Sequence, residues 1–212
     1  MKHVAMDEDL DPEYIRERIA DGKVVIPANH KRKATESCGI GAGLRTKVNA
    51  NIGTSADYPD VENEMEKLRA AEEAGADAVM DLSTGGDLRA IRKKIIGSAS
   101  IAVGSVPIYE AAVKTVQHKH AIVDMTATDM LEAIRLHCED GVDFITVHCG
   151  ATKGVLKHLK ESKRICGVVS RGGTFLVEWM IHSGKENPLY EEYDEILAIA
   201  KEYDVTISLG DA

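Results

Sequence analysis

The chain has 212 residues, a formal net charge of −9 and an apolar content of 44%, which fits one large globular domain or two small ones with a substantial core. The negative charge argues against nucleic acid and anionic membranes as general partners, and an aromatic content of 4% argues against a stacking surface for single-stranded nucleic acid. Nor does any apolar run reach the roughly 20 residues of a membrane span.

The four cysteines, Cys38, Cys138, Cys149 and Cys166, are far apart and form no C-x-x-C pair. We therefore expect reduced thiols, mostly in the core, and neither a zinc site nor an iron–sulfur cluster within this chain. The first residues lead directly into acidic sequence, so we expect no signal peptide and a cytoplasmic protein.

Residues 1–43 predict a lead-in of helix and loop. Asp11–Asp21 is typical of a short helix with Pro12 near its start, and Lys23–Pro27 of a brief extended segment. Ala28–Gly43 ends in G-I-G-A-G, but no clear strand precedes these glycines and no helix follows them. We therefore interpret this segment as a loop rather than a phosphate-binding turn.

From Leu44 onward, short apolar runs alternate with stretches of helical periodicity. The clearest unit is Gly75–Ile96, in which an apolar run ends in Ser-Thr-Gly-Gly and Asp87 can cap the helix that follows. Six runs predict strands: Thr46–Ile52, Ala78–Ser83, Ile101–Ile108, Asp143–His148, Gly167–Val169 and Val205–Leu209. Helices are predicted at Val61–Ala74, from Leu88, from Glu110, and at Ala127–Glu139, Lys153–Glu161, Phe175–His182 and Tyr190–Glu202.

This alternation predicts the α/β class, with a parallel sheet covered by helices. An open doubly wound sheet and a (β/α) TIM-type barrel both fit, and the lack of a Rossmann fingerprint favours the barrel. A complete barrel has eight strands, so residues 44–212 would supply about six of them, as the substrate-binding part. Because unpaired strand edges are rarely left open, we expect a larger barrel, a partner that supplies the missing strands, or an open sheet.

Polar side chains gather where the predicted strands end, and we expect them to face one mouth because the carboxyl ends of parallel strands meet at one edge. They are Asn49, Asn51, Asp81, Ser83, Thr84, Tyr109, His148, Ser170, Arg171 and Asp211. The S-R-G-G turn suits a phosphate, which arginine binds bidentately and peptide N–H groups complete. Aspartate and asparagine suit ribose hydroxyls or a heterocycle. His148 is an acid/base, a hydrogen-bond donor or a structural residue.

Seven strings occur in order along the chain: K-V-N-A-N-I-G-T-S (47–55), V-M-D-L-S-T-G-G-D-L (79–88), V-P-I-Y (106–109), G-V-D-F-I-T-V-H-C-G (141–150), G-V-V-S-R-G-G (167–173), E-N-P-L-Y (186–190) and Y-D-V-T-I-S-L-G-D (203–211). Together they closely resemble the phosphomethylpyrimidine synthase family of thiamin biosynthesis, and the resemblance covers essentially the whole chain.

The resemblance implies a radical S-adenosylmethionine enzyme on a (β/α) barrel. Such an enzyme rearranges 5-aminoimidazole ribotide to hydroxymethylpyrimidine phosphate with S-adenosylmethionine and a four-iron four-sulfur cluster. It further implies a homodimer and allows a second divalent metal such as zinc or iron. By motif match the ribotide pocket is lined by Asn51, Met80, Tyr109, His148, Ser170, Arg171, Gly172 and Asp211. No catalytic residue is assigned.

The sequence departs from the family pattern after its sixth predicted strand. A further arginine, a glutamate, two metal-ligating histidines and a C-x-x-C-x-x-x-x-C cluster motif belong to the family and are absent here, so we expect no turnover by this chain alone. Ala212 stands where the family has glycine.

Three alternatives remain open at this stage. One is the paralogous 5-hydroxybenzimidazole synthase, which uses the same ribotide for a cobamide lower ligand. Another is a non-catalytic ribotide-binding half-barrel or one piece of a split enzyme. The third is an aldolase-like lyase with His148 as base, which the lack of a lysine at a strand tip argues against.

Overall fold

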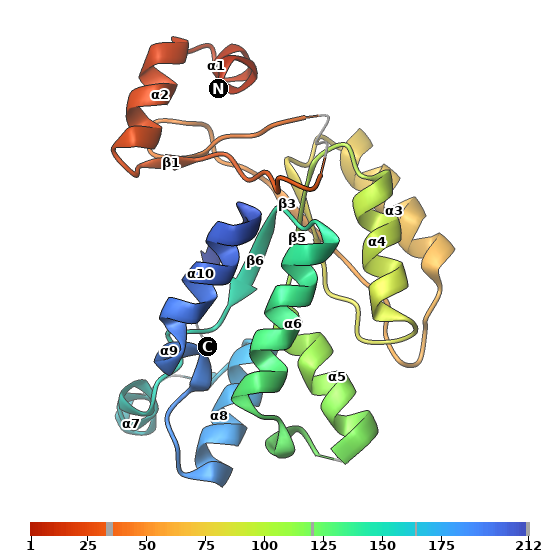
Figure 1. Ribbon diagram of the computed structural model, residues 1–212, viewed down its shortest axis with the longest axis vertical. Helices are drawn as coiled ribbons and strands as arrows, with labels where there is room; N and C mark the ends of the chain where they lie inside the picture. Colours follow the sequence, from red (N-terminus) through yellow and green to blue (C-terminus); the bar gives the residue numbers. More distant parts are fainter. Residues whose placement is uncertain (33–35, 120, 164, 211–212) are drawn as a thin grey trace.

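A five-stranded parallel sheet forms the centre of the computed structural model, which describes residues 1–32, 36–119, 121–163 and 165–210 (Figure 1). Each strand pairs with the next one along the chain, and every pair is parallel. All carboxyl ends therefore lie at one edge of the sheet. The strands are β3 (Asn49–Ile52), β4 (Ala78–Asp81), β5 (Ala102–Ser105), β6 (Phe144–Val147) and β7 (Thr206–Leu209).

Helices connect the strands, and several begin at a side chain that caps their first turn. Asp60, Asp87 and Thr152 accept backbone N–H groups in this way, and Thr126 and Asp129 form a capping box. The helices are α3 (Val61–Glu73), α4 (Leu88–Ser98), α5 (Pro107–Lys119), the short 3-10 helix η1 (Ile122–Asp124), α6 (Ala127–Asp140), α7 (Lys153–Glu161), α8 (Arg171–Ser183), α9 (Pro188–Glu191) and α10 (Tyr193–Tyr203). Within the described ranges, no helix is both long and apolar enough to cross a bilayer.

The two faces of the sheet differ in what covers them. Val79, Val103 and Ile145 lie on the outer face, where they pack into the main core clusters together with residues of the helices. The residues that alternate with these along the strands point to the other side, where the register aligns them in a second row across the sheet. We call this second side the inner face, and its central row is Asn51, Met80, Gly104, Phe144 and Thr206.

The N-terminal unit lies beside the amino ends of the strands (Figure 1). It consists of α1 (Lys2–Asp7), α2 (Pro12–Ala20) and an antiparallel pair, β1 (Val24–Val25) with β2 (Ile40–Gly41). Asn29 joins it to the end of α6 and the turn before β6, because its Nδ2 donates to the carbonyl oxygens of Cys138 (2.8 Å) and Val142 (2.9 Å).

Two of the strand predictions are wrong. Gly167–Val169 is not a strand, because both edges of β6 are already paired, with β5 and with β7. The sheet therefore has five described strands rather than six. The strand predicted at Ile101–Ile108 ends at Ser105, and α5 begins at Pro107 rather than Glu110. Proline is favoured in the first turn of a helix, which explains the early start.

Two further predicted helices have different bounds in the structure. The helix expected at Phe175–His182 begins at Arg171, and the helix expected at Tyr190–Glu202 is divided into α9 and α10. A helix at Lys2–Asp7 was not predicted, and β2 lies in a segment that we expected to be a loop. The predicted helices at Asp11–Asp21 and Lys153–Glu161 are confirmed.

Candidate functional site

The S-R-G-G sequence forms the beginning of helix α8 rather than a turn after a strand. Ser170 is the N-cap, and its Oγ accepts the N–H of Gly173 at 3.0 Å. Arg171 and Gly172 are the first two helical residues, whose N–H groups have no partner within a helix. The positive end of the helix dipole adds to the charge of the exposed Arg171 side chain. This helix start is therefore suited to an anion.

Tyr109 lies beside this helix start, in the first turn of α5. The Arg171 guanidinium carbon is 5.1 Å from the centroid of the Tyr109 ring, within the range of a cation–π contact. The edge of Phe175 meets the same ring with the centroids 6.2 Å apart. Burial raises the pKa of Tyr109, and Arg171 opposes that shift. The Tyr109 side chain is therefore uncharged, and its ring is the surface that orients the Arg171 guanidinium.

His148 follows β6 and continues the inner-face alternation of Phe144 and Thr146. Its side chain is buried, and it lies against two glycines. A Cβ atom on Gly172 would be 2.4 Å from its Cε1, and one on Gly210 would be 3.1 Å from its Cδ2. The ring is therefore enclosed between the start of α8 and the end of β7. Position 172 requires glycine because the buried ring occupies the space of a side chain, and at position 210 a side chain would have only a tight fit.

Asn51 and Met80 lie together in a second group, as register partners on β3 and β4. Asn51 is exposed, and its Oδ1 accepts Nδ2 of Asn49 at 3.3 Å. Phe144 lies in the same row, with its ring over Gly104, where an added Cβ would meet a ring carbon at 2.1 Å. We did not predict Phe144 as part of the site. The sequence signal that could have found it is Gly104, because a glycine within a buried strand often marks a place where another group approaches the backbone closely.

Two of the polar residues expected in the mouth have a structural role instead. Asp81 lies on the outer face with Ile52, and its Oδ1 accepts the N–H of Ser83 at 2.9 Å. The hydroxyl of Ser83 accepts the N–H of Thr54 at 3.1 Å. Asp81 and Ser83 therefore join the loops that follow β3 and β4. Asp211 lies outside the described residues.

A groove of about 530 Å³ adjoins the Tyr109–Arg171 contact. Thr84, Gly85 and Gly86 after β4 form one wall, and α5 and Phe175 form another. The structure thus brings Thr84, Tyr109 and Arg171 to one groove, and it places His148 directly against Gly172, the residue after Arg171.

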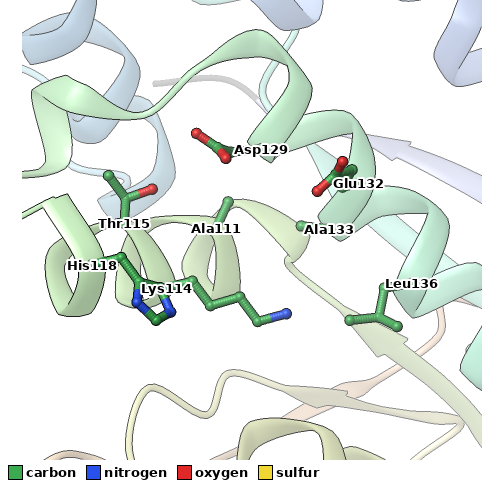
Figure 2. A pocket seen from close by; sticks show the side chains of 8 residues that line it. All are labelled: Ala111, Lys114, Thr115, His118, Asp129, Glu132, Ala133 and Leu136. Atoms are coloured by element: carbon green, nitrogen blue, oxygen red, sulfur yellow. The ribbon is translucent and has the colours of Figure 1, made fainter.

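A second cavity, of about 320 Å³, lies between α5 and α6 (Figure 2). Its polar lining comes from Lys114 and His118 on one helix and from Asp129 and Glu132 on the other. No residue from a strand end reaches it, so we do not assign the site there.

The described part of the chain holds no group of three or more histidine, cysteine, aspartate or glutamate side chains that could bind a metal ion. Burial raises the pKa of Cys138 to about 12 and that of Cys149 to about 11, so both thiols stay protonated at neutral pH. The cysteines do not fit an iron–sulfur cluster, because such clusters are held by several neighbouring thiolates.

Together these features define an α/β protein with a helix start, an arginine and a buried histidine at the carboxyl edge of its parallel sheet. Proteins of this class bind phosphate-bearing ligands at that edge. The chain belongs to the Radical SAM ThiC family, whose match covers residues 1–212.

Curated relatives named phosphomethylpyrimidine synthase are similar over the whole chain. The protein of Desulforamulus reducens is 54% identical over 211 residues, and that of Moorella thermoacetica is 53% identical over 211 residues. An archaeal relative from Methanopyrus kandleri is 52% identical over 213 residues. Each match covers 100% of this chain but only 49%, 49% and 50% of the respective relative. The chain therefore spans about half the length of these proteins.

Proposed function

We propose that this chain is the ribotide-binding part of a radical S-adenosylmethionine enzyme that rearranges 5-aminoimidazole ribotide to hydroxymethylpyrimidine phosphate, a step of thiamin biosynthesis. Family membership and the shared name of the relatives support this proposal. The observation that carries it is the placement of Arg171 in the first turn of α8, over the Tyr109 ring and next to the glycine that contacts His148. That cluster has the chemistry needed for a phosphate attached to a polar ring.

In this proposal the phosphate is bound at the start of α8. The Arg171 guanidinium supplies charge-assisted hydrogen bonds, and the N–H groups of Arg171 and Gly172 complete the site. Ser170 shapes this helix start through its capping bond to Gly173. His148 and Asp211 would contact the ribose or the imidazole, and Asn51 and Met80 would form the opposite wall.

We further propose that the sheet belongs to a (β/α) barrel. Its strand order follows the chain without a reversal, whereas a doubly wound sheet has a switch point where the order reverses. The outer face is packed against helices, and the inner face carries Asn51, Met80 and Phe144. Two strand edges, on β3 and β7, are where further strands would join to close the barrel.

The cluster that delivers the electron in radical S-adenosylmethionine chemistry does not fit the thiols of the described residues, so we derive no step through it. Its ligands, and those of a second metal, would belong to the half of the relatives that this chain does not span. We propose that this chain binds and orients the ribotide, in a cytoplasmic homodimer, while the rest of the enzyme supplies the radical.

The test is anaerobic turnover of 5-aminoimidazole ribotide by the intact encoded protein, with S-adenosylmethionine and a reductant. Formation of hydroxymethylpyrimidine phosphate is the expected result. Formation of 5-hydroxybenzimidazole would instead assign the paralogous reaction. Ribotide binding without turnover, in a protein that lacks the cysteine motif, would leave a binding module and contradict the enzymatic proposal.

A further inference from the structure

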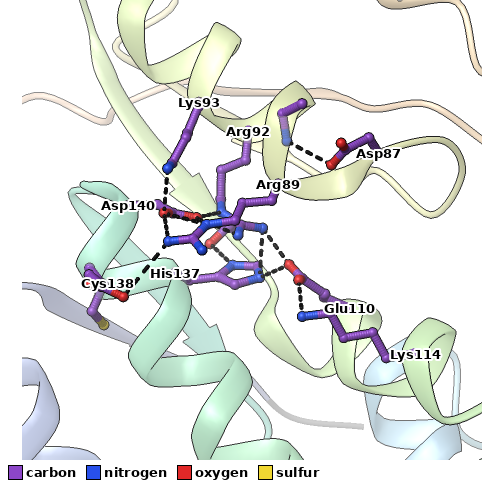
Figure 3. Close-up of polar contacts among 12 residues, drawn as sticks. Asp87, Arg89, Arg92, Lys93, Glu110, Lys114, His137, Cys138 and Asp140 are labelled. Carbon is purple, nitrogen blue, oxygen red and sulfur yellow. Dashed lines mark hydrogen bonds and ion pairs between the residues drawn. The ribbon is translucent and has the colours of Figure 1, made fainter.

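A buried ionic cluster lies outside the sheet, between α4, α5 and α6 (Figure 3). We call it the Arg92 cluster, and its members are Arg92, Glu110, His137 and Asp140. The Arg92 guanidinium donates from Nη1 to Glu110 Oε2 at 2.5 Å and from Nη2 to Asp140 Oδ2 at 2.6 Å. His137 Nε2 is 2.9 Å from the same Glu110 oxygen. The Arg92 side chain is only 2% exposed.

Burying these groups is costly in free energy. Charges taken out of water repay their desolvation only when geometry and hydrogen bonds are good, and apolar residues of similar volume often serve stability as well. The surrounding core is apolar, with Ile91 and Ile95 of α4 and Ala133 and Ile134 of α6 fully packed. Stability alone is therefore a weak reason for an ionic cluster at this place.

The cluster holds both ends of the turn between β5 and α5. Ser105 is the last residue of β5, and its Oγ is 2.7 Å from Nδ1 of His137. Glu110 is in the first turn of α5, at Nε2 of the same imidazole. One histidine ring thus connects the residue before the turn with a residue after it. Lys114 holds the second oxygen of Glu110 at 2.6 Å, so that neither carboxylate oxygen is left to rotate.

Tyr109 is the residue next to Glu110, between the two points that His137 holds. Its ring is the surface against which the Arg171 guanidinium rests. Arg171 forms no ion pair with any residue in the described ranges, so the ring is the contact that sets where its charge lies. A shift of the first turn of α5 would therefore move the arginine as well.

We propose that Glu110 and His137 are positioning residues for ligand binding: through the β5–α5 turn they hold the Tyr109 ring where it aligns Arg171 with the phosphate of the bound ribotide. The cluster itself does not touch the ligand, because Ser105 lies on the outer face in register with Asp81 and Ile145. This inference rests on the proposed function, in which Arg171 binds that phosphate.

The test is a double-mutant cycle in the intact encoded protein, with the dissociation constant for 5-aminoimidazole ribotide measured by calorimetry. Glu110→Gln keeps the shape of the side chain and removes its charge, and we expect it to weaken binding at least tenfold. Glu72→Gln is the matched control. Glu72 Oε1 accepts two hydrogen bonds from Ser100 at the amino end of the sheet, far from Tyr109, and we expect its loss to change affinity less than twofold.

The decisive comparison repeats Glu110→Gln in protein that already carries Arg171→Ala. Without the Arg171 side chain, Glu110 can no longer affect binding by positioning it. Glu110→Gln should then change the affinity less than twofold. An equal loss in both backgrounds would overturn the inference, because it would show that Glu110 does not act through Arg171. If Glu110 had only a structural role, Glu110→Gln and Glu72→Gln would both lower the melting temperature, and their effects on the affinity for the ribotide would not differ.

Two further outcomes are separable. Ser105→Ala removes one hydroxyl from the His137 bridge and serves if Glu110→Gln does not fold. We expect it to weaken binding about threefold with Arg171 present and not at all without it. If the parent protein does not bind the ribotide, or if Arg171→Ala binds it as well as the parent does, the proposed function fails and this inference with it. If Arg171→Ala weakens binding but the Glu110 and Ser105 variants do not, only the inference is overturned.

Discussion

The polar residues at the amino end of the parallel sheet differ from those of the candidate site at its carboxyl end. At the amino end, Asp143 is completely buried, and its two oxygens accept the N–H groups of Asn29 (3.1 Å) and Val103 (2.8 Å). The same carboxylate pairs with Arg32, whose Nη2 also donates to the carbonyl oxygens of Ala99 and Ile101. Every one of these groups is bonded within the chain.

At the carboxyl end, Asp81 and Ser83 are also bonded within the chain, but Arg171 of the candidate site is not used in this way. Arg171 is exposed, and within the described ranges its contact is an aromatic ring rather than a carboxylate. The hydroxyl of Thr146, two residues before His148, is buried and has no hydrogen-bond partner among the described residues. In a (β/α) barrel, the fold that we propose for this sheet, residues at the amino end of the strands serve stability and those at the carboxyl end serve function. The comparison predicts that mutations at the two ends have separable effects on stability and binding.

The largest effect is expected for Asp143→Ala at the amino end. It leaves the buried Arg32 charge and two backbone donors without an acceptor, and breaking a buried ion pair costs about 3–5 kcal/mol of unfolding free energy. Urea denaturation measures this loss. Asp57→Ala, at an exposed aspartate, should stay within about 0.5 kcal/mol of the parent. A loss below about 1 kcal/mol for Asp143→Ala would show that the amino-end network does not stabilise the fold.

The second effect is a dependence of stability on pH through His137. Burial lowers the pKa of His137 from 6.5 to about 4. Because the folded-state pKa is below the unfolded one, the stabilising contribution is complete above pH 6.5 and is lost as the pH falls towards 4, by roughly 3 kcal/mol. The pKa of Glu110 is also lowered, so its contribution is lost in the same direction at lower pH.

Urea melts between pH 7.5 and 4 measure this dependence. His137→Gln should flatten it, whereas His182→Gln, at an exposed histidine, should leave it as in the parent. Equal slopes for the parent and His137→Gln would contradict the assignment.

A third, smaller effect is expected for Gly172→Ala at the carboxyl end. Alanine normally favours a helix over glycine, but here the added Cβ would be 2.4 Å from a carbon of the buried His148 ring. Overpacking of this kind costs about 1–3 kcal/mol, and movement of the ring should also weaken ribotide binding. Gly97→Ala in α4 is the matched control, because its Cβ would meet nothing within 4 Å. If both variants are stabilised, His148 does not lie where the structure places it.

The smallest effect is expected for Thr146→Val. The Thr146 hydroxyl is buried with no partner in the described part of the chain, so replacing it by a methyl group of the same shape should raise the unfolding free energy by about 1 kcal/mol. Thr54→Val should lower it by a similar amount, because the Thr54 hydroxyl donates to the carbonyl oxygen of Gly85 at 2.7 Å. Thermal unfolding of the two variants measures the difference. A destabilised Thr146→Val would mean that the hydroxyl contributes to the fold.

Local features of this fold could be predicted from the sequence because their causes are local. The cap at Asp87 and the helix at Lys153–Glu161 follow from residues within one or two turns. The pairing of β1 with β2 could not be found in this way, because it joins residues about 15 positions apart with no apolar alternation. The error at Gly167–Val169 has the same origin: whether a short apolar run finds a free strand edge depends on the whole sheet.

The candidate site was predictable in its composition but less so in its geometry. Arg171 and His148 come to the same end of the sheet, as the strand-and-helix alternation predicts. Asp81 was assigned to the mouth although its strand parity places it on the helix-covered face with Ile52. The contact of Gly172 with His148 depends on the packing of α8, about which the sequence pattern says nothing.

The account depends most on the carboxyl end as a phosphate site, and Arg171→Ala tests this directly. The affinity of 5-aminoimidazole ribotide is measured by calorimetry for the intact encoded protein and for this variant, with Arg16→Ala, an exposed arginine of α2, as the control. We expect a loss of about 1.5–3 kcal/mol in binding free energy, the range for hydrogen bonds to charged groups, with unfolding free energy unchanged. Unchanged affinity in Arg171→Ala would contradict the account.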